Sequence, residues 1–231
     1  MPIVKNEDDS WRFLRSLYYL NDTFFDENWD RSYNSQTVVR KNNTFYRPEE
    51  WPEQEPLVKI LCYILMPNHI HLLVKEIREK GTSSFMKKLG QSMTNHFNKK
   101  YESKGSIFQG AYKGKTVRTD KYLRYVSVYI MVKNAFELYP GGFQKAIENF
   151  ESAWKFAVEY PFGSLADYVA GRNSPIIDRD ILGEIFDRPS ELKSFARDVM
   201  KGGKWKGDEK GDEKDKKLAR LIFDDYNSQT N

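Results

Sequence analysis

Two apolar stretches separated by a short turn constrain the fold of this chain more than any other feature. Val58–Met66 (VKILCYILM) is an almost continuous apolar run rich in β-branched and aromatic residues, which is typical of a strand buried on both faces. The turn-forming triplet Met66-Pro67-Asn68 follows, and His69–Ile77 (HIHLLVKEI) then has the composition of a second strand. The sequence therefore predicts a β-hairpin.

Helices are expected on either side of this hairpin along the chain. Periodic apolar residues predict helices over residues 6–22, 83–101 and 120–136, with further helical stretches near 143–159 and 178–200. The polar, proline-containing residues 23–56 are interpreted as a long loop, and residues 105–118 as a glycine-punctuated strand and loop.

Two histidines are the sharpest chemical feature. In a strand, His69 and His71 lie on one face while Ile70 points to the other. Two adjacent imidazoles make half of a site for a divalent metal. Taken alone, the triplet is a weak signal, because two strand histidines more often only satisfy local hydrogen bonds, so its meaning depends on the surrounding sequence.

Positive charge is concentrated in one segment. The chain has a net charge of +4, whereas residues 82–125 contain ten basic and two acidic residues, a net charge of +8. Aromatic residues interleave with these cations, a combination that suits unpaired nucleic-acid bases and their phosphates. The alternative is a solvated helix face whose aromatic residues turn into the core. The clustering favours nucleic acid, and the candidate DNA-binding residues are Lys87, Lys88, Lys99, Lys100, Lys113, Lys115, Arg118 and Arg124.

The composition excludes several classes of protein. The one cysteine, Cys62, rules out an internal disulfide framework and a multi-cysteine zinc site. No apolar run approaches the ~20 residues that span a bilayer, and the first ten residues lack the apolar core of a signal peptide. We therefore expect a cytoplasmic protein that does not bind membranes.

Three blocks of sequence resemble one known family. The first is Tyr63–Val74 (YILMPNHIHLLV), the second is Gly105–Lys113 (GSIFQGAYK), and the third combines Tyr122-Leu123 with Tyr129-Ile130. In this order and approximate spacing, they resemble the one-tyrosine HUH transposases of the IS200-like family, in the branch of the REP-associated tyrosine transposases. The resemblance covers about residues 6–140.

The resemblance implies an α+β fold. Its expected form is a ferredoxin-like (RRM-like) antiparallel sheet with helices on one face, followed by a C-terminal helical extension. Residues 1–140 would then be the catalytic domain and residues 141–200 the extension. Residues 201–231 form a charged tail with the repeat GDEKGDEK, whose composition predicts disorder.

The resemblance also implies an activity, that of an endonuclease and strand transferase acting on single-stranded DNA, with DNA hairpins as recognition elements. By this likeness His69 and His71 hold Mg²⁺ or Mn²⁺. Tyr129 attacks the phosphorus and forms a 5′-phosphotyrosine link, and Tyr125, one helical turn earlier, is the reserve nucleophile. Relatives act as monomers or as homodimers that share active sites, and the sequence does not choose between the two.

The segment after Tyr129 departs from the family pattern. The family continues Y-I-x-x-N-P, and a polar group one turn after the tyrosine completes the metal site. Here Lys133 occupies that position and Asn134 follows, about 140° round a regular helix from Tyr129. Either the helix bulges or ends so that Asn134 turns inward as the third ligand, or that ligand comes from elsewhere. Lys133 can instead contact a DNA phosphate.

A second departure lies at the N-terminus. The family has a strand before its first helix, whereas Met1 nearly adjoins the helix predicted over residues 6–22. The options are a start placed too far downstream, a decayed copy, or a replacement strand from residues 36–46.

These departures keep two other functions open, a catalytically inactive or domesticated binder of single-stranded or hairpin DNA, and a metal-free RNA binder that uses the sheet face. The paired histidines argue against the RNA binder.

Overall fold

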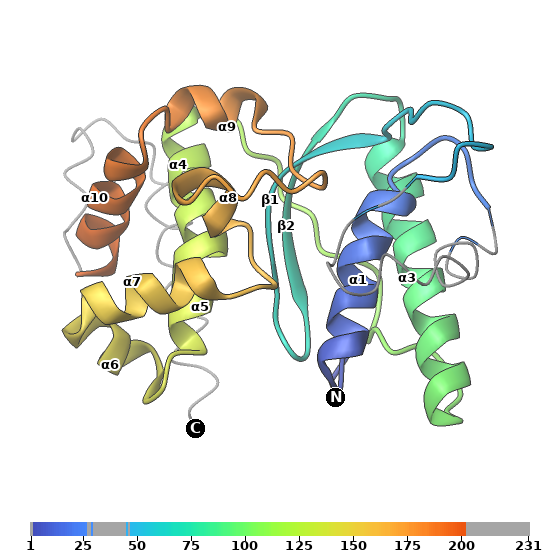
Figure 1. Cartoon of the computed structure of the whole chain (residues 1–231), viewed down its shortest axis with the longest axis horizontal. Helices are drawn as coiled ribbons and strands as arrows, with labels where there is room; N and C mark the ends of the chain where they lie inside the picture. Colours follow the sequence, from blue (N-terminus) through green and yellow to red (C-terminus); the bar gives the residue numbers. More distant parts are fainter. Residues whose placement is uncertain (1, 27–28, 30–44, 46, 202–231) are drawn as a thin grey trace.

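The β-hairpin forms as predicted and lies between two groups of helices (Figure 1). The computed structural model describes residues 2–26, 29, 45 and 47–201. Strands β1 (Val58–Leu65) and β2 (Ile70–Glu76) pair antiparallel, with a register shift between Ile60 and Cys62. This shift inserts one residue into β1 and so changes which residues of the strand face each side.

One face of the hairpin is covered by α1 (Glu7–Tyr19) and α3 (Gly81–Tyr101), which pack against each other (Figure 1). Asn6 caps α1, because its side chain accepts a hydrogen bond from the Asp9 N–H. The apolar residues of this core come from all of these elements and include Phe13, Leu17, Val58, Ile60, Tyr63, Leu65, Phe85, Leu89 and Met93. The apolar periodicity of the sequence thus correctly predicted these two helices and the side of each helix that packs into the core.

The other face is covered by a longer helical assembly. Its first part is α4 (Asp120–Val128), η2 (Tyr129–Lys133) and α5 (Asn134–Glu137), which follow one another without a break. The remaining helices are α6 (Gly142–Glu148), α7 (Phe150–Glu159), α8 (Leu165–Val169), α9 (Asp180–Ile185) and α10 (Pro189–Met200). One apolar core joins β1 to helices on both sides of residue 140, so the extension packs directly on the preceding part of the chain.

The outer edge of β1 is covered by the C-terminal extension. Its hydrogen bonds are Leu65 N–H to Phe162 O (2.8 Å), Ser164 N–H to Tyr63 O (2.9 Å), Tyr63 N–H to Ser164 Oγ (2.9 Å), Tyr160 O–H to Leu65 O (2.8 Å) and Tyr168 O–H to Leu61 O (2.6 Å). An uncovered strand edge would leave these backbone groups open to pairing with other chains. The extension therefore satisfies the backbone groups along this edge of β1.

The α+β class and the C-terminal helical part are confirmed. Helices cover both faces of the hairpin, whereas the resemblance implied helices on one face. The sheet of the described residues consists of the two strands β1 and β2. Residues 105–118 form an irregular segment without a strand, which suits a stretch that is rich in glycine and lysine and poor in β-branched residues.

The replacement strand proposed over residues 36–46 and the tail after Lys201 lie outside the described residues, apart from Phe45. No helix within the described ranges is long and apolar enough to cross a membrane.

Candidate active site

Three aromatic rings meet where β2 begins. His69 lies in the turn before β2, His71 lies within the strand, and Tyr129 is the first residue of η2. The ring centroids of the two histidines are 4.7 Å apart, and those of His71 and Tyr129 are 5.5 Å apart. Because η2 contacts both strands, the structure brings the two predicted metal ligands and the predicted nucleophile together within one chain.

Burial keeps both imidazoles neutral. It is the largest cause that lowers the pKa of His71 to about 4, and repulsion by His69, when that ring is protonated, and by Lys133 adds to it. Burial also lowers the pKa of His69, which Glu137 raises and Lys133 lowers further. At pH 7 each ring therefore has a nitrogen lone pair available for a metal or a proton.

The neighbouring Asn68 orients the first of these rings. His69 Nδ1 lies 2.6 Å from Asn68 Oδ1. An amide oxygen only accepts, so the Nδ1–H donates in this contact and the lone pair remains on Nε2. The turn after β1 thus supplies a residue that fixes the first histidine for ligation through Nε2, a role that sequence reasoning did not assign to Asn68.

The helix that carries Tyr129 bulges, as one of the sequence alternatives required. Residues Tyr129–Lys133 form a π-helical turn, in which the backbone N–H of Asn134 donates to Tyr129 O, five residues back. The side-chain Nδ2 of Asn134 donates to the same oxygen at 2.9 Å. Such a turn accommodates one extra residue and often marks a functional position. The amide of Asn134 therefore stabilises the bulge that orients Tyr129, and its role as a metal ligand stays a prediction.

Lys133 lies in this bulge and is 4% exposed. Its Nζ pairs with the carboxylate of Glu137 and lies 5.0 Å from the centroid of the Tyr129 ring. Because both charges affect the pKa of His69, a lysine–glutamate pair belongs to the site. Sequence reasoning missed Glu137, although the i, i+4 spacing from Lys133 was a usable signal.

The donor set suits a metal in part. The paired neutral imidazoles fit two ligands of a divalent cation. However, the described residues contain no group of three or more His, Cys, Asp or Glu side chains arranged to hold an ion. The nearby carboxylate of Glu137 is paired with Lys133, and the Asn134 amide is bonded to Tyr129 O. The residues therefore fit a two-histidine site whose other ligands would be substrate oxygens or water.

The reserve nucleophile lies elsewhere. Tyr125 is half-buried, and its ring packs edge-on against Phe195 of α10 with 5.3 Å between centroids. Burial raises the pKa of its hydroxyl to about 12. The geometry favours Tyr129 over Tyr125, because the ring of Tyr129 packs against His71 whereas the ring of Tyr125 packs against Phe195 of α10.

The candidate DNA-binding cations separate into two groups. Some are engaged within the protein: Lys88 Nζ donates to Asp22 O (2.6 Å), Lys100 Nζ to Asp9 Oδ1 (2.5 Å), and the Arg124 guanidinium lies 5.2 Å from the Phe186 ring centroid. The exposed ones are Lys87, Lys99, Lys113, Lys115 and Arg118. Three of the exposed cations lie in the segment that joins α3 to α4, between the two groups of helices (Figure 1).

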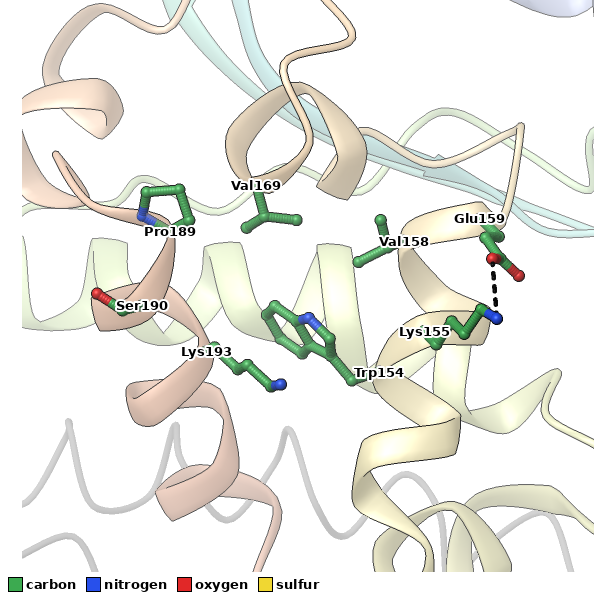
Figure 2. Close-up of a pocket in the computed structure, with 8 residues that line it drawn as sticks. All are labelled: Trp154, Lys155, Val158, Glu159, Val169, Pro189, Ser190 and Lys193. Atoms are coloured by element: carbon green, nitrogen blue, oxygen red, sulfur yellow. Dashed lines mark ion pairs between the residues drawn. The ribbon is translucent and has the colours of Figure 1, made fainter.

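A cavity of about 380 Å³ lies apart from the histidines, among α7, α8 and α10 (Figure 2). Trp154 forms its floor, with Val158 and Val169 beside it. Lys193 Nζ lies 5.8 Å from the Trp154 ring and also pairs with Glu151 at 2.7 Å. None of the three site rings lines this cavity, so the candidate active site is formed at the hairpin and not here.

A comparison with protein families agrees with the motifs. Residues 53–133 match the sequence model of the family described as "Transposase IS200 like". This stretch contains β1, β2, α3, both histidines and Tyr129, which confirms the resemblance to that family. No curated protein and no solved structure matches the chain.

Proposed function

We propose that this chain, whose residues 53–133 belong to the IS200-like transposase family, cleaves and rejoins single-stranded DNA through Tyr129. The observation that carries the proposal is the meeting of His69, His71 and Tyr129 at one end of the hairpin. Neutral imidazoles beside a phenol on a bulged helix provide ligands and a nucleophile for one reaction centre.

The proposed reaction conserves the phosphodiester bond energy. The Tyr129 hydroxyl loses its proton and its oxygen bonds to the scissile phosphorus. The bond from phosphorus to the 3′ oxygen breaks, and that oxygen takes up a proton, which leaves a 5′-phosphotyrosine and a free 3′-hydroxyl. In the reverse step a 3′-hydroxyl attacks the phosphorus and the tyrosine oxygen leaves. A phenol is a good leaving group, so strands are rejoined without ATP.

The chain's own residues position this reaction. His69 and His71 would hold Mg²⁺ or Mn²⁺, which when bound supplies Lewis-acid polarisation of a phosphate oxygen. Asn68 fixes the ring of His69. The π-helical turn, stabilised by the side chain of Asn134, directs Tyr129 toward His71.

The exposed cations near residue 110 would bind the DNA. Lys113, Lys115 and Arg118 are exposed, and Tyr112 in the same segment is 46% exposed. Cations contact phosphates, and an exposed aromatic ring can stack on an unpaired base. We propose single-stranded DNA that folds into hairpins as the substrate class.

One observation favours the second candidate, an inactive DNA-binding protein of the same ancestry. Among the described residues, no group of three or more His, Cys, Asp or Glu side chains is arranged to hold a metal ion. This candidate predicts hairpin binding that weakens with salt and no cleavage with any divalent metal.

A covalent-adduct assay separates the two candidates. The full chain is mixed with labelled single-stranded oligonucleotides from the DNA flanking its gene, with Mn²⁺ or EDTA, and run on a denaturing gel. We expect a metal-dependent adduct that Tyr129→Phe and His69→Ala abolish. Tyr125→Phe is the matched control, because it keeps the ring that packs on Phe195, and should leave the adduct intact. Hairpin binding without an adduct would support the inactive binder.

A further inference from the structure

Lys133 is an unusual residue for the interior of a protein. Lysines are rarely buried unless they are paired, yet Lys133 is 4% exposed. Two contacts offset the cost of removing its charge from water. Glu137 forms an ion pair with its Nζ, and the face of the Tyr129 ring lies 5.0 Å from the same atom. The structure therefore holds an ion-paired lysine side chain beside the proposed nucleophile.

The position of this charge relates it to the reaction. Its Nζ lies 5.0 Å from the ring centroid of the proposed nucleophile, and that ring packs at right angles to His71 with 5.5 Å between centroids. The π-helical turn produces this arrangement, because Lys133 is its last residue and Tyr129 its first. An ammonium group so placed can contact a phosphate that the Tyr129 oxygen attacks.

A fixed cation at this point has two opposite consequences. It attracts a phosphate and the negative charge that grows on its oxygens during displacement. It also repels a divalent cation held by the neighbouring imidazoles. Loss of the charge should therefore strengthen metal binding and weaken the chemistry, a pair of effects that damage to the fold would not produce.

We propose that Lys133 is a catalytic residue whose ammonium group binds the scissile phosphate and supplies positive charge beside Tyr129 and the histidine pair. The inference rests on the proposed DNA cleavage and deepens it. The covalent step is unchanged: the Tyr129 oxygen bonds to phosphorus as the bond to the 3′ oxygen breaks. Lys133 stays charged throughout and gives up no proton.

Three variants test this role in the full chain. Lys133→Met removes the charge with little change in shape, Lys133→Arg keeps the charge, and Glu137→Gln removes the partner while keeping the ammonium group. If the lysine–glutamate pair is merely structural, loss of either partner has the same effect. If Lys133 acts on the phosphate, Glu137→Gln, which keeps the ammonium group, loses much less of the adduct rate than Lys133→Met.

Adduct formation and metal binding are measured separately. Under saturating Mn²⁺ we expect the adduct rate to fall about 100-fold in Lys133→Met and to fall by a smaller factor in Lys133→Arg and Glu137→Gln, which keep a cation at this position. By calorimetry with Mn²⁺ alone, Lys133→Met should bind about three- to tenfold more tightly, and Glu137→Gln more weakly, than the unaltered chain. Thermal melting shows that each variant is folded, and Lys133→Gln replaces Lys133→Met if the latter is not.

The possible results separate the inference from the function on which it rests. An adduct that forms in Lys133→Met at the rate of the unaltered chain would overturn the role of Lys133 alone. Equal losses in Lys133→Met and Glu137→Gln would also overturn it, in favour of a structural pair. If the unaltered chain forms no adduct with any oligonucleotide or metal, the proposed function is wrong, and so is the inference that rests on it.

Discussion

The two faces of the hairpin are covered in different ways. The face under α1 and α3 is closed by regular helices, and its main charge cluster lies at the end of these helices, where Asp9 accepts hydrogen bonds from Lys100 and Tyr101. The face under α4 and α5 has a bulged helix, and its polar groups meet beside β2. The first arrangement stabilises the fold, and the second places polar and ionisable side chains in the interior.

The difference teaches where to look for function in such a chain. The irregular turn Tyr129–Lys133 and the buried cation within it are costly features that folding alone does not require. They occur beside the histidine pair and are stabilised by Asn134 and Glu137. Local irregularity and proposed function therefore coincide on one face only.

The largest expected effect concerns whether one chain alone provides the whole candidate active site on the second face. His71 and Tyr129 are in contact within a single chain, so we expect each chain to form its site without residues from a second copy. We predict that Tyr129→Phe mixed with His69→Ala forms no adduct, because neither chain then has a complete site. Mixed variants are refolded together before the assay so that subunits can exchange. Recovery of an adduct in the mixture would show that sites are shared between copies.

The next effect tests the close approach of α3 to the hairpin on the first face. A Cβ added at Gly81 would lie 2.2 Å from Leu57 O, a backbone atom that cannot easily move. We expect Gly81→Ala to lower the free energy of unfolding by about 2–3 kcal/mol, measured by denaturant unfolding. Gly90→Ala, in the same helix, meets nothing within 4 Å and should raise it by about 0.5–1 kcal/mol. Equal effects at the two positions would contradict this packing.

A third prediction concerns the strand edge that the extension covers. The buried Ser164 Oγ accepts from the Tyr63 N–H and donates to Tyr63 O. Ser164→Ala leaves that N–H without this partner, and we expect a loss of about 1–2 kcal/mol in the free energy of unfolding. Ser152→Ala removes an exposed hydrogen bond with Tyr139 and should change stability by less than about 0.5 kcal/mol. A loss at Ser152 as large as that at Ser164 would argue against the edge contact.

The last prediction concerns Asp9 on the first face, whose contribution to stability is lost only on acidification. Burial alone would raise the pKa of Asp9, but hydrogen bonds from Lys100, Tyr101 and the Lys5 N–H outweigh burial and lower it to about 2. A depressed folded-state pKa contributes stability above the unfolded value of 3.8 that is lost as the pH falls toward 2. Unfolding measured from pH 6 to pH 2 should lose about 2 kcal/mol in the unaltered chain beyond the loss in Asp9→Asn. The exposed Asp8→Asn is the control and should follow the unaltered chain.

Much of the fold follows from local patterns in the sequence. The continuous apolar run gave β1, the turn at Pro67 gave the hairpin, and apolar periodicity gave α1, α3 and the helical segment after Thr119. The histidine spacing and the family motif predicted which side chains should act together. Their convergence with Tyr129 agrees with that prediction.

The rest depends on contacts between segments far apart in the chain. Nothing in the sequence of Phe162–Ser164 indicates that its backbone lies along β1, about 100 residues earlier, because backbone pairing carries no side-chain signal. The one-residue offset of Asn134 indicated a bulge or a helix end but did not choose between them. The engagement of Lys88 and Lys100 within the protein could likewise not be read from a cluster of charges.

The central claim is that the phenol of Tyr129 is the group that joins the DNA. The most direct test is to digest the covalent adduct and locate the attached nucleotide by mass spectrometry. The account predicts a nucleotide on the peptide that contains Tyr129, bound through the tyrosine oxygen. A nucleotide on Tyr125 or on any other residue would contradict it.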